Sequence, residues 1–188
     1  MPHRSAVAFI GDSLTEGWQS TGLEVWEACY AERHALNFGV AGDLGSDVLW
    51  RVEHGELDGA APRLVVLLAG TNDLGSGASP AETFKGVAAC LRAIVARLPD
   101  AHVLLLGILP RGAGGPGTPM RRSVSSVNAT LAALDDGKLV HFLDIGDAFL
   151  NPDGTVRAEL FEADKVHLAA PGYRAWADAM GAAFAALL

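Results

Sequence analysis

The stretch Leu64-Val-Val-Leu-Leu-Ala69, followed by Gly70-Thr-Asn-Asp73, decides the fold class of this chain. An unbroken apolar run of this length, rich in branched side chains, is typical of a strand covered on both faces. The glycine and the polar residues after it end the strand at a defined point. Strands of this kind occur in parallel sheets with helices on both sides, so the segment predicts an α/β fold.

The same alternation continues in both directions along the chain. The predicted strands are Ala6–Ile10, Ala35–Phe38, Leu64–Ala69, Val103–Ile108 and Leu139–Asp144. Amphipathic segments separate them, and we expect helices over Leu23–Arg33, Ser46–Glu53, about Pro80–Leu98, a stripe from Val124 to Leu134, and one from Pro171 to Leu187. The alternation predicts a three-layer α/β/α sandwich around a five-stranded, mostly parallel sheet. Ligands of such sheets bind outside the carboxyl ends of the strands.

Length and charge limit the function classes. The chain has 188 residues, which predicts a single domain over residues 1–188. Its formal net charge is −8, so phosphate backbones and anionic lipid would repel it, and we expect no nucleic-acid partner and no membrane insertion. The Arg121–Arg122 pair is interpreted as the solvated start of a helix, and Cys29 and Cys90 as buried free thiols.

The sequence also predicts where the chain acts and what it needs. The apolar run after Met1–Ser5 is too short for the core of a signal peptide, which predicts a cytoplasmic protein. The histidines His3, His34, His54, His102 and His141 show no metal-ligand spacing, with His102 and His141 at strand starts and interpreted as structural. We therefore expect no metal and no cofactor.

Four short segments follow the predicted strands or precede the last helix. They are Gly11-Asp-Ser-Leu14, Asn37-Phe-Gly-Val-Ala-Gly-Asp43, Gly70-Thr-Asn-Asp73 and Asp164-Lys-Val-His-Leu168. Each alone has an ordinary explanation as a turn, a cap or a surface ion pair. Together they supply a hydroxyl nucleophile, backbone and amide donors for an oxyanion, and an imidazole with a carboxylate three residues away. That set is complete for ester cleavage.

These four segments resemble the four blocks of the SGNH (GDSL) hydrolase superfamily, in order and over most of the chain. The resemblance implies a flavodoxin-like sandwich, with Ser13 as nucleophile, His167 as general base and Asp164 as its orienter. It further implies an oxyanion hole made of the N–H groups of Ser13 and Gly42 and the side-chain amide of Asn72. No cofactor takes part in this chemistry.

A narrower resemblance lies in Leu36–Asp43, Val48-Leu-Trp-Arg-Val52, Gly55-Glu-Leu57 and Leu109-Pro-Arg-Gly112. These segments are similar to the catalytic subunits of intracellular type I platelet-activating-factor acetylhydrolases. The similarity implies a short acyl group, a homodimer, and an acyl pocket formed by Leu14, Thr71 and Val166. Ala41 and Asp73 depart from the pattern of that subgroup, which leaves the phospholipid substrate open.

Three other functions remain open at this point. The first is a carbohydrate or other small-molecule acetylesterase, in which Trp18 or Trp50 could stack on a sugar, although core or rim packing is the better explanation of both residues. The second is a lysophospholipase or thioesterase with a long acyl chain. The third is a non-catalytic binding module that retains the fold. A fold of the α/β-hydrolase type is disfavoured because the sequence lacks its Gly-x-Ser-x-Gly elbow.

Overall fold

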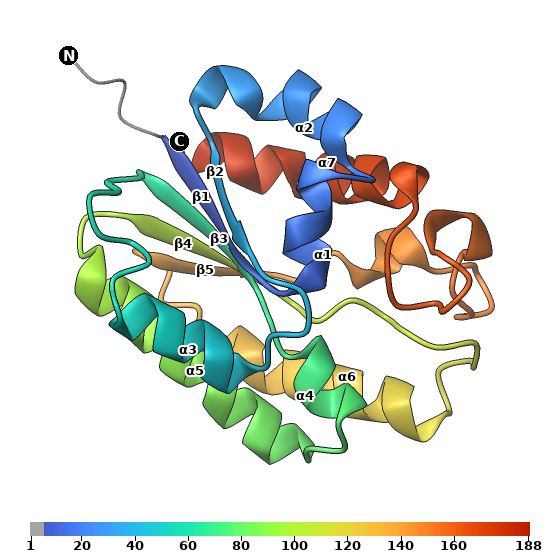
Figure 1. The fold of residues 1–188 in the computed structure, drawn as a ribbon. Coiled ribbons are helices and arrows are strands. Elements are labelled where there is room, and N and C mark those ends of the chain that lie inside the picture. The colour runs from blue at the N-terminus through green and yellow to red at the C-terminus, as the bar shows by residue number, and fades with distance from the viewer. Residues whose placement is uncertain (1–5) are drawn as a thin grey trace.

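The computed structural model describes residues 6–188, so the segment Met1–Ser5 and His3 lie outside it. The strands β1 (Val7–Gly11), β2 (Leu36–Gly39), β3 (Leu64–Leu68), β4 (His102–Leu106) and β5 (Val140–Leu143) form one sheet. Its order is β2-β1-β3-β4-β5, and every neighbouring pair is parallel (Figure 1). The predicted α/β sandwich with a five-stranded sheet is confirmed.

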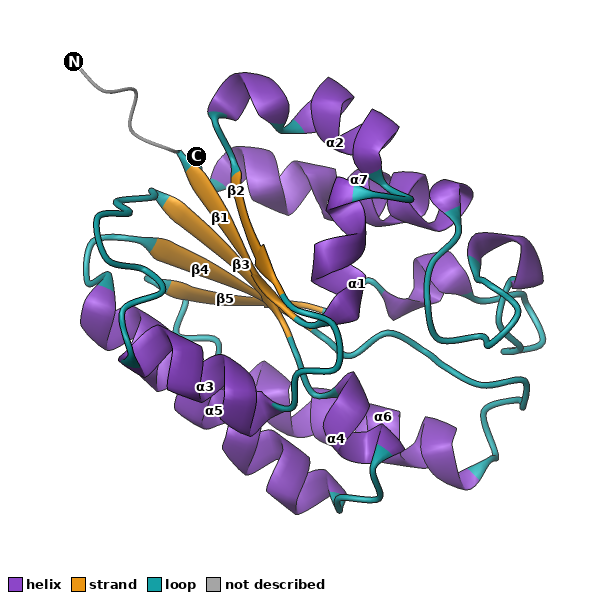
Figure 2. Ribbon diagram, viewed as in Figure 1, coloured by secondary structure: helices purple, strands orange, loops and turns teal. Residues whose placement is uncertain are grey.

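Helices cover both faces of this sheet (Figure 2). They are α1 (Ser13–Glu16), α2 (Leu23–Cys29), α3 (Gly45–Glu53), α4 (Thr71–Gly75), α5 (Pro80–Arg97), α6 (Pro119–Leu131) and α7 (Ala170–Ala186). Helix α5 begins with a capping box, in which the side chains of Ser79 and Glu82 accept hydrogen bonds from each other's backbone N–H groups. Among residues 6–188, no helix combines the length and the apolar character needed to cross a bilayer.

The two faces bury separate apolar clusters because alternate residues of a strand point to opposite sides. In β1, Val7 and Phe9 pack with the residues of α1, α2 and α7, whereas Ala8 and Ile10 pack with those of α3, α5 and α6. The central strands β1 and β3 are buried along their whole length. This explains why their sequences are continuous apolar runs rather than alternating ones.

The structure differs locally from the prediction in two ways. The helix expected over Leu23–Arg33 ends at Cys29, and a 3-10 turn over Ala31–Arg33 follows. The reason is Tyr30, which is buried against Phe9 with its ring centroid 4.9 Å away, so the chain leaves the helix there and turns toward β2. The structure also adds α1 and α4, which are too short to show a helical period in the sequence.

The observed burial also tests the predictions made for individual side chains. Arg121, predicted to be solvated, is buried and donates a hydrogen bond to the Gly154 carbonyl oxygen, whereas Arg122 is exposed. Of the predicted buried thiols, Cys90 is buried and Cys29 is partly exposed. Trp18 is a fully buried core residue. Trp50 is 61% exposed and stacks on the His54 ring.

Candidate active site

Ser13 is placed by the abrupt transition from β1 to α1. Asp12 caps α1 by accepting a hydrogen bond from the Leu14 N–H at 3.0 Å, so Ser13 becomes the first helical residue directly after the strand. Gly11 permits this turn, because a Cβ at that position would lie 2.2 Å from the Leu68 carbonyl oxygen of the neighbouring strand. The serine hydroxyl therefore stands at the carboxyl edge of the sheet, where parallel sheets bind ligands.

The structure brings the predicted nucleophile and base together from opposite ends of the chain. Ser13 Oγ lies 3.0 Å from His167 Nε2, and His167 Nδ1 lies 2.6 Å from Asp164 Oδ2. Burial of Asp164 works against its charged form. Hydrogen bonds from the His167 side chain and from the N–H groups of Val166 and His167 outweigh this and lower the pKa of Asp164 to about 2. Because an ionised carboxylate can only accept, Nδ1 carries the proton and Nε2 is left to accept from the Ser13 hydroxyl.

The loop that carries His167 is held mainly by backbone contacts. Lys165 adopts a left-handed conformation with φ 57°, and its carbonyl oxygen accepts a hydrogen bond from the Gly112 N–H at 2.9 Å. The Glu162 N–H donates to the carbonyl oxygen of His167. The side chains of His167 and Asp164 are each 49% exposed. This half of the site is therefore open to solvent.

The loop between β2 and α3 carries the predicted backbone donor Gly42. Gly42 has φ 84°, in the region that favours glycine, and a Cβ there would meet nothing within 4 Å. Neither the Gly42 N–H nor the Ser13 N–H donates to a backbone acceptor among residues 6–188. Asn72, on α4, donates one side-chain N–H to the Asp43 carbonyl oxygen at 2.9 Å. The three predicted oxyanion donors thus come from the ends of β1, β2 and β3.

Two polar side chains without a predicted catalytic role also hold these strand ends together. The Asn37 amide donates to the Thr15 carbonyl oxygen and accepts from the Gly39 N–H, which joins β2 to α1. The Asp73 carboxylate accepts from the Gly45 N–H at 2.9 Å and so joins α4 to the start of α3. Asp73, which departs from the acetylhydrolase pattern, has a structural role here.

A cleft of about 600 Å³ opens beside Ser13 and His167. The other residues that line it are Glu16, Gly17, Gln19, Ser20, Thr21, Ala41, Glu162, Leu168 and Tyr173. Glu16 could have been found from sequence only by placing a helix start at Ser13, because it then follows one turn later on the same face. Glu162 carried no signal, since it belongs to an irregular loop.

The residues of the predicted acyl pocket are not among those that line this cleft. Leu14 is buried in the core, with 2% of its surface exposed. Thr71 is buried as well, and its hydroxyl and carbonyl oxygens both accept from the Arg111 guanidinium. Val166 is partly buried on the loop before His167. The acyl-pocket assignment therefore stays a prediction.

Two buried groups near Ser13 have raised pKa values. Asp12 is fully buried, and burial raises its pKa to about 7 despite the hydrogen bond from the Leu14 N–H. Tyr173 donates its hydroxyl to the Leu14 carbonyl oxygen at 3.0 Å. Burial raises the pKa of Tyr173, and the negative charges of Asp12, Glu16 and Glu162 raise it further. The Tyr173 hydroxyl is therefore a neutral donor that fixes the backbone after Ser13.

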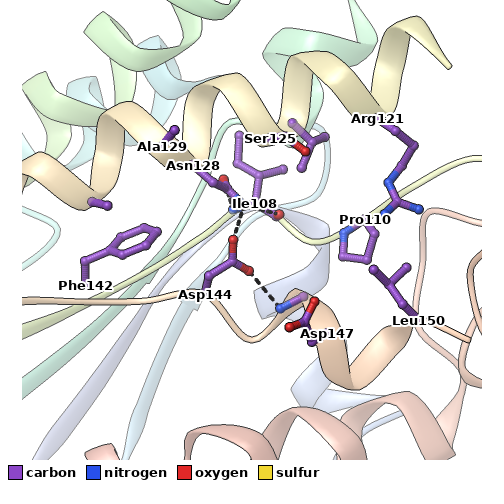
Figure 3. A pocket seen from close by; sticks show the side chains of 13 residues that line it. Ile108, Pro110, Arg121, Ser125, Asn128, Ala129, Phe142, Asp144, Asp147 and Leu150 are labelled. Atoms are coloured by element: carbon purple, nitrogen blue, oxygen red, sulfur yellow. Dashed lines mark hydrogen bonds between the residues drawn. The ribbon is translucent and has the colours of Figure 1, made fainter. Parts of the chain in front are cut away.

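A second pocket, of about 300 Å³, lies between α6 and the segments that follow β4 and β5 (Figure 3). The Asn128 amide at its centre accepts from the Ile108 N–H and donates to the Ile108 carbonyl oxygen and to Asp144. Asp144 in turn accepts from the Gly146 N–H. These bonds hold the end of β4 to β5. The residues lining this pocket are different from those predicted for catalysis.

Comparison with known protein families gives a match that spans most of the chain. A model of the GDSL-like lipase/acylhydrolase family matches residues 9–175 of the chain, a range that includes the segments of Ser13, Gly42, Asn72 and His167. The chain belongs to the GDSL-like lipase/acylhydrolase family. Membership makes it a carboxylic ester hydrolase, as the four sequence segments predicted.

One relative agrees with the narrower resemblance, and two solved structures share the fold. The platelet-activating factor acetylhydrolase IB subunit alpha1 of Bos taurus is 38% identical over 169 residues, which are 89% of this chain and 69% of that protein. A GDSL-like lipase from Bacteroides thetaiotaomicron has the same fold, with a TM-score of 0.79, 23% identity and coverage of 98% and 89% of the two chains. An acetylxylan esterase from Geobacillus stearothermophilus gives a TM-score of 0.72 with 21% identity, over 93% and 91% of the chains.

Proposed function

We propose that this acylhydrolase is a serine esterase that cleaves short-chain acyl esters, acetyl esters above all, through an acyl-Ser13 intermediate. The observation that carries the proposal is the contact of Ser13 Oγ with His167 Nε2 at 3.0 Å, combined with that of His167 Nδ1 with Asp164 at 2.6 Å. An ionised carboxylate that fixes the imidazole tautomer and an imidazole that accepts the serine proton form an activated nucleophile.

In the first half of the reaction, Ser13 Oγ attacks the ester carbonyl carbon while its proton passes to His167 Nε2. Asp164 stabilises the imidazolium that forms. The carbonyl oxygen becomes an oxyanion, which the N–H groups of Ser13 and Gly42 and the free N–H of the Asn72 amide stabilise. When the tetrahedral intermediate collapses, the bond to the alcohol oxygen breaks and His167 gives the proton to that oxygen. The alcohol leaves and the acyl group stays on Ser13.

In the second half, water takes the place of the alcohol. His167 Nε2 accepts a proton from the water as its oxygen attacks the acyl-serine carbonyl carbon, and the same three donors stabilise the second oxyanion. Collapse of this intermediate breaks the bond to Ser13 Oγ and returns the proton to it. The carboxylic acid leaves and the enzyme is restored.

The cleft beside Ser13 can bind a polar leaving group. Its lining includes Gln19, Ser20 and Thr21, together with the carboxylates Glu16 and Glu162. Hydroxyl, amide and carboxylate groups bind hydroxylated molecules through hydrogen bonds. The second candidate is therefore an acetylesterase for carbohydrates or other hydroxylated molecules. The name of the acetylxylan esterase neighbour supports this candidate.

Hydrolysis of p-nitrophenyl acetate, butyrate and octanoate tests the reaction and the acyl length together. The wild-type protein is expected to show the largest kcat/KM with acetate, and Ser13→Ala is expected to show no turnover while remaining folded. A fluorophosphonate probe should label Ser13, as located by mass spectrometry, and should fail to label Ser13→Ala. Turnover in Ser13→Ala contradicts the nucleophile, a preference for octanoate contradicts the short acyl group, and lack of both labelling and turnover identifies a binding module.

The cytoplasmic location predicted from the sequence and the homodimer that the resemblance implies belong to the same proposal. The acetylhydrolase relative is named as a subunit, which supports an assembly. Light scattering coupled to size exclusion is expected to give twice the 19.6 kDa mass of the chain, and a monomer mass at micromolar concentration contradicts the dimer.

A further inference from the structure

One segment of the narrower resemblance has no part in the mechanism above. It comprises Val48-Leu-Trp-Arg-Val52 and Gly55-Glu-Leu57, which lie in α3 and the turn after it. Val48 and Val52 face the core and are fully buried, which accounts for the apolar positions. Arg51 and Glu56 are charged but only 15% exposed at their side chains, so packing does not account for them.

Arg51 points from α3 back toward the ends of the first two strands. Its guanidinium donates to the Gly11 carbonyl oxygen at 3.1 Å and to the Phe38 carbonyl oxygen at 3.1 Å. It also forms an ion pair with the Asp43 carboxylate at 2.7 Å and a second one with Glu56. One side chain therefore bonds the last residue of β1, the end of β2 and the loop that follows β2.

Two of these contacts lie one or two residues from the predicted oxyanion donors. Gly11 is two residues before Ser13, and Asp43 directly follows Gly42. The Asp43 carbonyl oxygen is the acceptor of the Asn72 amide, so the third donor is linked to the same residue. We propose that Arg51 is a positioning residue, which holds the three oxyanion donors in one arrangement through Gly11 and Asp43. This inference rests on the proposed esterase function.

The physical argument is preorganisation. Oxyanion donors accelerate a reaction only if they already point at the developing charge, because reorientation during the step would cost most of the gain. Gly42 is an exposed glycine, so the loop that contains it has little rigidity of its own. The planar guanidinium can donate to two strand-end carbonyl oxygens and to a carboxylate at once. The ammonium of lysine lacks this fixed arrangement of donors. Asp43 and Glu56 balance its charge in this partly buried place.

The experiment measures kcat and KM with p-nitrophenyl acetate for Arg51→Gln, Arg51→Lys and the matched control Arg97→Gln. Arg97 also contacts the end of α3, through the Glu53 carbonyl oxygen, and pairs with Asp58, but it has no contact with the strand ends. Arg51→Gln is expected to lower kcat by about 10²-fold, as for loss of one oxyanion donor. Arg51→Lys should lower kcat by only about 10-fold, because lysine restores part of the function. KM should change by less than about threefold in both variants because ground-state binding is unaffected. Arg97→Gln should retain the wild-type kcat.

A double-mutant cycle with Asn72→Ala separates positioning from general destabilisation. If Arg51 acts through the oxyanion donors, Arg51→Gln should lower kcat by a smaller factor in the Asn72→Ala background than in the wild-type protein, since one of the three donors that it holds is already absent. An additive loss, or an unchanged kcat in Arg51→Gln, overturns the inference. If Arg51→Gln does not fold, the same cycle with Arg51→Lys decides. Activity that survives Ser13→Ala refutes the proposed function instead, so the two failures are distinct.

Discussion

The two halves of the catalytic crevice are built in different ways. The half with Ser13 and Gly42 stands on strand ends and is held by the fully buried Asp12 and by the partly buried Arg51 guanidinium. The half with Asp164 and His167 stands on an irregular loop, with side chains that are about half exposed and are held mainly by the backbone bonds of Gly112 and Glu162.

The difference predicts how substitutions divide between activity and stability. Changes to Asp12, Arg51 or Asn72 in the strand-end half should affect both, because these side chains also form hydrogen bonds with backbone groups. Changes in the loop half should affect activity alone, because exposed side chains contribute little to folding. The four tests below would break or refine this division.

The largest effect is expected for His167→Gln in the loop half. Removal of the base should lower kcat for p-nitrophenyl acetate by at least about 10⁴-fold, since the nucleophile then has no proton acceptor. The free energy of unfolding should change by less than about 0.5 kcal/mol, as for an exposed site. Kinetics and urea denaturation measure the two quantities. His54→Gln, a histidine on the turn after α3, is the control and should retain full activity; residual high turnover in His167→Gln would remove the residue from the mechanism.

Asp12→Asn tests the buried half through the pH dependence of stability. The pKa of Asp12 is raised from 3.8 to about 7 in the folded protein, mainly by burial. Between these values the folded state binds the proton and the unfolded state does not, so the Asp12 contribution to stability is present below about pH 4 and is lost as pH rises toward 7. At 1.36 kcal/mol per pKa unit, the full shift is worth about 4 kcal/mol.

In Asp12→Asn this titration is removed while an oxygen acceptor for the Leu14 N–H is kept. The variant should therefore gain stability relative to wild type as pH rises from 4.5 to 7.5 in urea denaturation, whatever the absolute difference. A difference between the two proteins that stays constant with pH would mean that the Asp12 carboxyl is ionised in the folded state.

Asn72→Ala should combine both consequences, on a smaller scale. Loss of one oxyanion donor is expected to cost about 3 kcal/mol of transition-state stabilisation, seen in kcat with KM nearly unchanged. Because the same amide donates to the Asp43 carbonyl oxygen, the free energy of unfolding should also fall by about 1 kcal/mol. A change in KM alone would contradict the oxyanion role. An unchanged free energy of unfolding would mean that Asn72 affects activity alone, as residues of the loop half do.

The same contrast explains what the sequence could predict. The fold followed from apolar runs such as Leu64–Ala69, because continuous burial on both faces leaves a direct trace in residue type. Ser13 and His167 followed from short motifs at predicted strand or helix ends. Arg51 could not be assigned, because its partners Gly11 and Phe38 offer backbone oxygens, which every residue has. Glu162 and the burial of Arg121 depend on how irregular loops pack, for which periodicity gives no signal.

The smallest effect concerns the two carboxylates that flank the cleft, one from each half. Glu16 lies on α1 and Glu162 on the loop, and both line the space beside Ser13. These carboxylates should favour an ester of a cationic alcohol over an ester of a neutral one. The test is the ratio of kcat/KM for acetylcholine to kcat/KM for its neutral analogue 3,3-dimethylbutyl acetate. This ratio should be higher in the wild-type protein than in Glu16→Gln or in Glu162→Gln. Exposed charges are worth about 0.2–1 kcal/mol, which gives a change of about 1.4- to fivefold that shrinks as salt is raised. Asp100→Asn removes one charge before β4, at the opposite edge of the sheet, and should leave the ratio unchanged. Equal effects of Glu16→Gln and Glu162→Gln would show that both halves contribute alike to selecting the alcohol, whereas an effect of Asp100→Asn as large as theirs would attribute the selectivity to net charge rather than to the cleft.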